Sequence, residues 1–235
     1  MPTLLEDALD RVYSAFARWS RPTVVDYCSH CVRPGVVEGL LVPTRLREIP
    51  AETLRLYTVY VLSTAGSLAD FRYFLPRMLD IAIADWFDGY PDLDVVLGKF
   101  VLGDWRGWPA HERQAVAAFL HAWWSTTLAR FPADPGPEAV LRSIGDIEDD
   151  LGPYLRTWEA ALATRAGANH LCDFVYANFG RKGQRYWLHV SGWGDTTVAP
   201  VRTWLAGLSG TVAATAETVT DEKTHDVLLE LLLSL

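Results

Sequence analysis

The sequence predicts an all-α protein built from antiparallel helix pairs, and three observations support this fold class. Apolar residues recur at intervals of three and four in successive segments, which is the period of a helix with one buried face. Proline or serine stands at the start of several segments, and glycine or proline follows their ends. Strand and helix patterns do not alternate over stretches of ~30 residues, which disfavours a doubly wound sheet. We expect the pairs to stack in a curved, HEAT-like array, although no fixed repeat period stands out.

The first half of the chain contains the clearest helix signals. The first helix is expected from Pro2, with an apolar face made by Leu4, Leu5, Ala8, Leu9, Val12, Phe16 and Trp19. Residues 21–28 read as extended. Residues 50–66 combine a proline start with the strand formers of 57–61, and the length of the apolar pattern favours a helix. Ser67 and Asp70 then form an acidic capping box, and Pro76 predicts a kink or a new helix that ends near 88–91.

Three prolines and a glycine in 131–137 form the strongest boundary of the chain. They divide an N-terminal helical half, 1–130, from a C-terminal half, 137–235, that we expect to pack on it as one continuous domain. Residues 185–190 are a candidate short strand. The remaining helices are expected at 92–102, 109–130, 138–148, 152–163, 169–179, 198–208 and 221–235.

Three stretches, "LREIPAETLRLYTVYVLSTAGSLADFRYFLPRMLDI", "VLGKF" and "WPAHERQAVAAFLHAWW", resemble a group of uncharacterised bacterial helical proteins. Members of that group carry a CxxC loop, a DFR-x-FLPR stretch and a Trp-Pro helix start. The likeness extends over residues 28–124 and weakens afterwards. The resemblance implies an all-helical fold and no particular activity, because the group has no established one.

Composition narrows the classes of partner. Half of the residues are hydrophobic and the net charge is −8, which is typical of a soluble globular chain and disfavours nucleic acid as a partner. The longest apolar runs fall short of the ~20 residues that a membrane span needs. The first residues carry acids where a secretory signal carries basic residues, so we expect a cytoplasmic protein.

"DYCSHCV" holds the most suggestive chemistry, with Cys28 and Cys31 flanking His30. A CxxC turn presents two thiolates to zinc, and a closed zinc site needs four ligands. The candidate metal set is therefore Cys28, Cys31, Cys172 and His30, although His30 points awkwardly between the two cysteines. His170 stands two positions from Cys172, which places the two on different faces of a helix. Packing of small thiols in a loop is the leading alternative, and a thioredoxin-type dithiol lacks its βαβ context.

A second candidate is the acidic cluster Asp146, Glu148, Asp149 and Asp150. On a helix, Asp146 shares a face with Asp149 and Asp150, a spacing that can hold Mg²⁺ against a diphosphate. That chemistry needs a second acidic motif, and the sequence offers no convincing partner. Gly152-Pro153 follows directly, so these acids are also suited to cap the next helix.

The remaining polar patterns favour structural roles. "HVSGWGDTT", residues 189–197, contains serine, histidine and aspartate but lacks the spacing of a nucleophile elbow, and Thr196 or Thr197 is expected to cap the following helix. His111-Glu112 lacks the second histidine of a zincin helix, so we expect His111 and His121 at the surface or partly packed. Most of the ten tryptophans are expected to fill the core.

These patterns favour a non-enzymatic protein that binds another protein through an acidic, aromatic-bearing surface. An immunity or antitoxin-like protein that covers a basic partner is one concrete version. The alternative is an all-α enzyme or metal-binding protein that uses 146–150 or the Cys28/Cys31 loop, with zinc as the candidate metal. No catalytic residues and no other cofactor are predicted, and the oligomeric state stays open.

Overall fold

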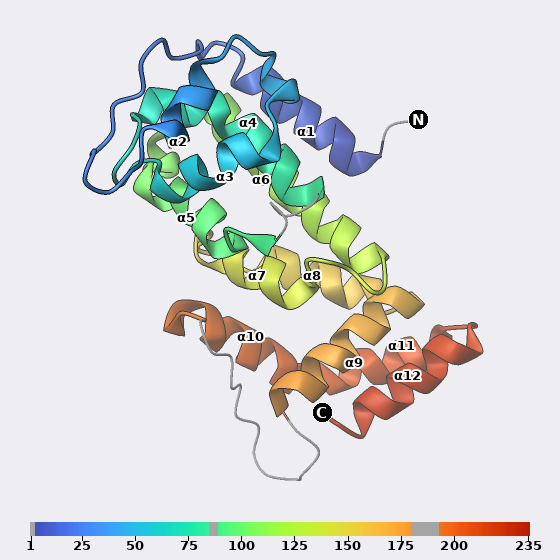
Figure 1. Ribbon diagram of the computed structural model, residues 1–235. Helices are drawn as coiled ribbons and strands as arrows, with labels where there is room; N and C mark the ends of the chain where they lie inside the picture. Colours follow the sequence, from blue (N-terminus) through green and yellow to red (C-terminus); the bar gives the residue numbers. More distant parts are fainter. Residues whose placement is uncertain (1–2, 85–88, 180–192) are drawn as a thin grey trace. The chain divides into compact units, whose positions relative to one another are not determined.

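A computed structural model describes residues 3–84, 89–179 and 193–235 (Figure 1). The regular structure of these residues is helical, and their only β pairing consists of isolated bridges from Ala65 to Tyr27 and to Val61. The predicted all-α class is confirmed. The candidate strand at 185–190 lies outside the described residues. Two compact units, 1–123 and 124–235, divide the chain, and the HEAT-like stacking stays a prediction.

The first unit is built from five long helices joined by short helical turns (Figure 1). In it, α3 contacts α4 and α5, and α4 also contacts α1 and α5. The last long helix, α6, runs on past Trp123 into the second unit. The elements are α1 (Leu4–Ala15), α2 (Gly35–Glu38), η1 (Gly39–Leu41), η2 (Leu46–Glu48), α3 (Ala51–Tyr60), α4 (Leu68–Ala84), α5 (Leu93–Leu102), η4 (Trp105–Gly107) and α6 (Ala110–Ala129).

Helix α1 begins with a capping box rather than at Pro2. The Thr3 hydroxyl accepts a hydrogen bond from the Glu6 backbone N–H, and the Glu6 carboxylate accepts one from the Thr3 backbone N–H. The helix ends at Ala15, four residues before Trp19, the last residue of the predicted apolar face. A proline follows closely at Pro22, and the residue before a proline avoids the helical region. Trp19 is thereby free to turn toward α6, as described below.

The ambiguous segment 50–66 forms helix α3 over Ala51–Tyr60, which includes most of its strand formers, and a tight turn follows. Leu54 and Tyr57 are fully buried. The helix ends at Tyr60 with Val61 as its C-cap, and Leu62 adopts a left-handed φ of 64°. The Leu62 backbone N–H then donates to the Ala65 carbonyl at 3.0 Å. Burial of one helical face therefore outweighs the β propensity of the valine and tyrosine residues.

Helix α4 begins at the predicted cap and continues through Pro76. The Asp70 carboxylate accepts hydrogen bonds from the Ser67 N–H and hydroxyl at 2.7 and 2.9 Å, which confirms the acidic capping box. The helix runs unbroken from Leu68 to Ala84, so a new helix at Pro76 was a wrong expectation. Pro76 removes one backbone hydrogen bond. The buried residues Phe74, Leu75 and Met78 surround it in the sequence, and their packing offsets that loss.

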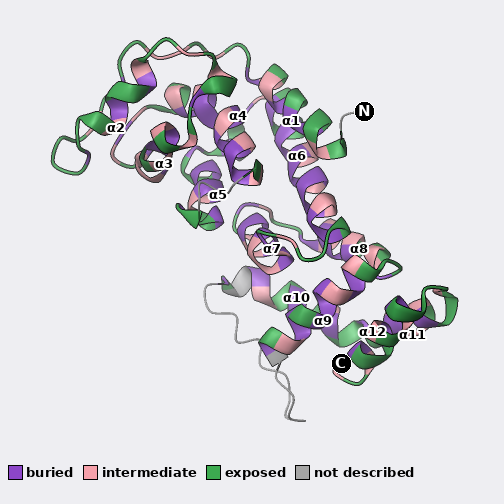
Figure 2. Ribbon diagram, turned by 45° about the vertical axis from the view of Figure 1, so that its right-hand side comes forward, coloured by how far each residue is buried: buried purple, intermediate pink, exposed green. Residues whose placement is uncertain are grey.

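Buried residues of the first unit lie along α4, α5 and α6 (Figure 2), and aromatic rings are prominent among them. The Trp108 ring lies 5.7 Å from the Phe16 ring, 6.0 Å from Phe71 and 5.8 Å from Phe100, measured between centroids. The Trp108 indole N–H donates to the Gly103 carbonyl at 2.8 Å. The expected core role of the tryptophans is confirmed for Trp105, Trp108, Trp123, Trp124, Trp158 and Trp193, which are all buried.

The described part of the second unit consists of helices α7 to α12 and the end of α6 (Figure 1). Helix α9 contacts α8 and α12, and α12 also contacts α11. No helix forms between Ala129 and Pro137, as the proline-rich boundary predicts. Sequence patterns missed α11, because its buried residues Val212 and Ala216 give only a weak apolar period. The elements are α7 (Pro137–Gly145), α8 (Gly152–Ala161), α9 (Arg165–Phe179), α10 (Asp195–Gly207), α11 (Ser209–Thr218) and α12 (Glu222–Leu232).

Gly167 allows close approach of the α8 and α9 backbones, which gives a testable prediction. A Cβ at this position would lie 2.3 Å from the Ala161 carbonyl oxygen. We expect Gly167→Ala to lower the free energy of unfolding by ~1–3 kcal/mol in urea titrations. The matched control is Gly210→Ala in α11, where nothing lies within 4 Å of the new methyl group. That variant is expected to be neutral or more stable by ~0.4–1 kcal/mol, and equal losses in both variants would contradict the close approach.

Candidate functional site

The CSHC loop places two exposed thiols next to each other in a tight turn of the first unit. The backbone N–H groups of Cys31 and Val32 both donate to the Cys28 carbonyl, at 3.0 and 2.9 Å. Hydrogen bonds from the Cys31 and His30 backbone N–H groups and from the Cys31 thiol lower the pKa of Cys28. The same thiol contact raises the pKa of Cys31. The Cys31 sulfur lies 3.9 Å from His30 Nδ1.

Cys172, the third predicted metal ligand, has a different environment in the second unit. It is buried in α9, and burial, followed by the charges of Glu230 and Asp173, raises its pKa to about 11. Within the described ranges no three histidine, cysteine, aspartate or glutamate side chains are grouped as a metal site. Cys28, Cys31 and His30 are neighbours in one turn, with the Cys31 thiol near the His30 imidazole. A zinc site that includes Cys172 stays a prediction.

The acidic cluster does not share a helical face. Helix α7 ends at Gly145, and residues 146–150 form turns and a bend. Aspartate side chains favour such turns because they compete for backbone hydrogen bonds, so the expected face shared by Asp146, Asp149 and Asp150 was wrong. Asp150 Oδ1 accepts a hydrogen bond from the Gly152 N–H at 2.8 Å, at the start of α8. Glu148 accepts one from the Tyr154 hydroxyl at 3.4 Å. The Asp150 contact lies at the start of α8, although the N-cap residue Leu151 makes no side-chain cap hydrogen bond.

The glycine-rich segment 189–197 is only partly described, and His189 and Ser191 lie outside the described residues. Thr197 does not cap α10. It is buried within the helix, and its hydroxyl donates to the Gly145 carbonyl at 3.2 Å. A Cβ at Gly145 would lie 2.3 Å from the Thr197 methyl carbon. Thr197 therefore joins α10 to the end of α7, and the expected cap by Thr197 was wrong.

His111 is exposed and His121 half-buried, as predicted, whereas Glu112 between them has an unexpected place. The Glu112 side chain is fully buried in α6. Its Oε1 accepts hydrogen bonds from Arg18 Nε and Trp19 Nε1, each at 3.0 Å, and Arg18 Nη2 lies 2.8 Å away. Sequence reasoning missed this carboxylate, because its partners are more than 90 positions away in the chain.

Arg72 of α4 completes this buried ionic cluster. Its guanidinium carbon lies 4.8 Å from the Trp19 ring centroid and 4.6 Å from that of Trp108, and its Nε lies 3.9 Å from Glu112 Oε2. Burial lowers the pKa of Arg72, and the charge of Glu112 opposes that effect. The cluster joins the segment after α1 to α4 and α6, and the guanidinium packs against two indole rings. It is therefore built to hold helices together.

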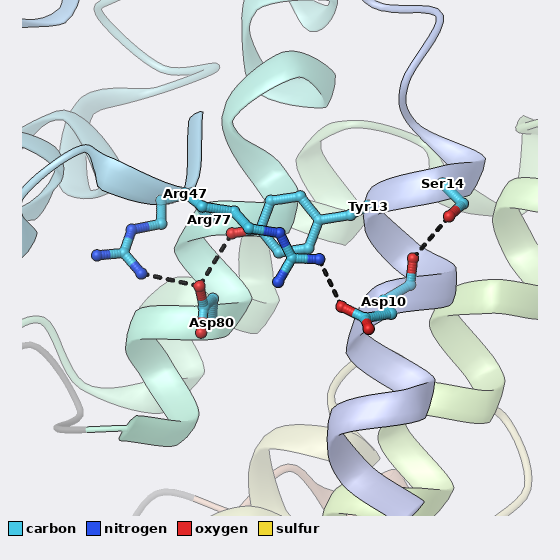
Figure 3. A network of polar contacts seen from close by, with 6 residues as sticks. All are labelled: Asp10, Tyr13, Ser14, Arg47, Arg77 and Asp80. Atoms are coloured by element: carbon cyan, nitrogen blue, oxygen red, sulfur yellow. Dashed lines mark hydrogen bonds and ion pairs between the residues drawn. The ribbon is translucent and has the colours of Figure 1, made fainter. Parts of the chain in front are cut away.

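A second polar network lies between α1, η2 and α4 (Figure 3). The Tyr13 hydroxyl donates to Asp80 Oδ2 at 3.0 Å, and Arg77 Nη1 contacts the same oxygen at 2.8 Å. Arg47 pairs with Asp10, and its guanidinium carbon lies 3.7 Å from the Tyr13 ring centroid. Burial and the charge of Asp80 raise the pKa of Tyr13, so the phenol stays protonated near neutral pH. A neutral phenol in an occupied network is not available as a base.

The clearest candidate binding site is a cleft of about 230 Å³ in the second unit. The proline-rich loop after α6 and the start of α7 form one wall, and α9 forms the other. Hydrophobic and small residues make up most of the lining. The lining residues are Phe131, Pro132, Ala133, Gly136, Pro137, Glu138, His170, Asp173, Phe174 and Ala177.

His170 connects the two walls of the cleft. Its Nε2 lies 2.6 Å from the Arg130 carbonyl oxygen. Because a carbonyl only accepts, Nε2 carries the proton in this contact. The Phe131 ring packs edge-on against the imidazole, with centroids 5.0 Å apart. His170 is buried and occupied by these contacts, so it fixes the loop against α9.

The charges of the cleft have one sign. Glu138 and Asp173 supply two carboxylates, and the described lining contains no lysine or arginine. Phe131 is 41% exposed, so its ring is accessible to a ligand, while Phe174 forms part of the buried wall. Carboxylates beside aromatic rings favour a cation, which gains both from charge pairing and from the ring faces. The cleft is thus suited to a guanidinium or ammonium group.

The sequence contained a signal for this cleft that went unused. The turn residues of 131–137 predict only a boundary. The same segment begins with the exposed ring of Phe131 and leads directly into Glu138. A loop stiffened by prolines is a common position for binding residues. His170 was considered only for its spacing from Cys172, and α9 in fact separates the two: His170 lines the cleft, whereas Cys172 does not.

Comparison of the chain with protein-family models, with curated proteins and with solved structures finds no match. The resemblance to the group of bacterial helical proteins therefore stays a prediction. Among the helices of the described residues, none combines the length and apolar character needed to cross a membrane.

Proposed function

We propose that this protein binds a basic protein, and that the cleft between the 131–138 segment and α9 receives one of its arginine or lysine side chains. The observation that carries this proposal is the lining itself. Two carboxylates, Glu138 and Asp173, and two rings, Phe131 and Phe174, line one cleft whose described lining has no lysine or arginine. The proposed function is binding rather than catalysis, and an immunity or antitoxin-like role is one form of it.

The size of the cleft favours a single side chain over a small-molecule substrate. Pockets for drug-sized ligands usually measure about 300–1,000 Å³, and this cleft is smaller, at about 230 Å³. Arginine suits it best, because the planar guanidinium is weakly hydrated, stacks on rings and pairs with carboxylates through two parallel hydrogen bonds. Contact with an aromatic ring adds ~0.5–2 kcal/mol, depending on desolvation. Such an anchor is typical of a binding hot spot.

The charge of the whole chain supports the same class of partner. The net charge of −8 attracts a basic surface, and this attraction extends over about one Debye length. Long-range attraction raises the association rate, while the cleft supplies the specific contact. We therefore expect binding to weaken as ionic strength rises.

A site-specific photo-cross-linker at Ala177, which is exposed in the cleft, tests the proposal in cells of the source organism. We expect one basic protein to be cross-linked and identified by mass spectrometry. The doubly neutralised variant Glu138→Gln/Asp173→Asn should lose this product, because the cation then has no carboxylate to pair with. The contact removed is worth roughly a tenfold to hundredfold change in Kd.

The matched control is Glu217→Gln/Asp226→Asn, which removes two exposed acids of the same unit that do not line the cleft. Both variants remove two negative charges and so change the net charge from −8 to −6, which leaves only the position of the acids different. The control is expected to retain the cross-linked product. Equal cross-linking in all three proteins, or loss in both variants, would contradict a role for the cleft. Thermal unfolding of each variant shows that the comparison is made between folded proteins.

A further inference from the structure

We propose that Cys28 and Cys31 form a reactive dithiol that reduces small disulfides and closes into an internal disulfide bond. This modification site lies in the first unit and does not depend on the proposed function of the cleft. The chemical class of the co-reactant is a low-molecular-weight disulfide, such as oxidised glutathione.

The backbone turn holds the two cysteines close together. The Cys31 N–H donates to the Cys28 carbonyl at 3.0 Å, which closes a four-residue turn. Such turns keep their first and fourth Cα atoms within about 7 Å. Disulfides usually join Cα atoms that are about 4.4–6.8 Å apart. Both thiols are free and exposed.

The turn is held in place by the hairpin that follows α3. The Cys28 N–H donates to the Thr64 carbonyl at 2.8 Å, and the Gly66 N–H donates to the Asp26 carbonyl at 2.7 Å. Tyr27 forms a bridge with Ala65 between these two bonds. Because these contacts fix the chain up to Cys28, and the buried Val32 follows Cys31 directly, closing the disulfide costs little additional order.

The exchange balances without another reagent. The Cys28 thiolate attacks one sulfur of the small disulfide, forms a mixed disulfide and releases one thiolate, which takes up a proton. Cys31 then loses its proton to water and attacks the Cys28 sulfur, which forms the internal bond and releases the second thiolate. Two electrons pass from the protein dithiol to the small disulfide, which leaves as two thiols.

Cys172 provides an internal reference for this reactivity. It is buried, and its pKa is raised to about 11, so its thiolate is scarce near neutral pH. Buried cysteines of this kind are inert toward exchange, whereas exposed thiols react. The same reagent should therefore modify the turn and leave Cys172 unchanged in the folded protein.

The test uses the full chain in glutathione redox buffers, followed by acid quenching, alkylation under denaturing conditions and peptide mass spectrometry. We expect the peptide that carries Cys28 and Cys31 to lose two hydrogens, while Cys172 is alkylated. Cys31→Ser should retain one glutathione on Cys28, because no second thiol resolves the mixed disulfide. Cys172→Ser is the matched control and should close the bond like the unsubstituted protein. Far-ultraviolet circular dichroism confirms that each variant is folded.

Two results would overturn the proposal. The first is accumulation of glutathione on both Cys28 and Cys31 of the unsubstituted protein without loss of the two hydrogens. The second is one equivalent of zinc per chain in the purified protein, released by a chelator only as these two thiols become reactive. In that case the turn is part of a metal site rather than a redox pair.

Discussion

Glu112→Ala is expected to lower the free energy of unfolding by ~3–5 kcal/mol, because breaking a buried ion pair from one side leaves the other charge uncompensated. Arg72 would stay between the rings of Trp19 and Trp108 without its carboxylate. The indole N–H of Trp19 and the guanidinium of Arg18 would lose their acceptor as well. Urea titration followed by tryptophan fluorescence measures the change, since two of the affected residues are tryptophans.

Glu112→Gln is the matched control for this variant. Glutamine keeps the volume and one side-chain oxygen acceptor but removes the negative charge, so we expect a smaller loss than for alanine. The half-exposed Arg18 can regain water, whereas Arg72 is only 8% exposed and cannot. An alanine variant as stable as the unsubstituted protein within about 0.5 kcal/mol would show that the cluster is not structural.

Trp158→Ala is expected to cost ~3–5 kcal/mol, the usual range for truncating a fully buried tryptophan. Its ring lies 5.3 Å from Trp124, 5.4 Å from Phe174 and 5.5 Å from Trp204, and its N–H donates to the Gly167 carbonyl at 3.2 Å. Truncation would therefore leave a cavity at the junction of α6, α8, α9 and α10. Because Phe174 lines the cleft, the cavity should also reduce the order of the cleft wall.

Trp158→Phe separates the cavity from the hydrogen bond. Phenylalanine fills much of the same space but donates no hydrogen bond, so the expected loss is ~1–3 kcal/mol, smaller than for alanine. Differential scanning calorimetry of the two variants measures both effects. If Trp158→Phe lost as much stability as Trp158→Ala, the hydrogen bond rather than packing would dominate at this position.

Helix positions were largely predictable because they depend on local chemistry. Ser67 and Asp70 lie three residues apart, and that spacing alone fixes their reciprocal hydrogen bonds. The apolar period of α1 also predicts the helix from local sequence alone, because Ala8, Leu9 and Val12 share one buried face. Prediction failed where tertiary packing decides, as in the unbroken passage of α4 through Pro76.

The polar sites were far less predictable because their members meet across the fold. Glu112 carries no local signal of burial, yet Arg18 and Trp19, more than 90 positions earlier, surround its carboxylate. The cleft likewise joins Phe131 and Glu138 to His170 and Asp173, which lie on a later helix. The acids at 146–150 are dense in the sequence, but turns and a bend at these residues leave them without a shared helical face. Pairing over such sequence distances is invisible to local spacing.

The most direct measurement is an NMR titration of the full chain with a short peptide that carries one central arginine. We predict nuclear Overhauser contacts between the arginine side chain and the rings of Phe131 and Phe174, with a Kd on the order of 1 mM for so small a ligand. Glu138→Gln/Asp173→Asn should abolish these contacts, and a peptide with glutamate in place of arginine should not produce them. Identical shifts from the arginine and glutamate peptides, or arginine contacts confined to residues outside the cleft, would contradict the assignment of this cleft as a cation-binding site.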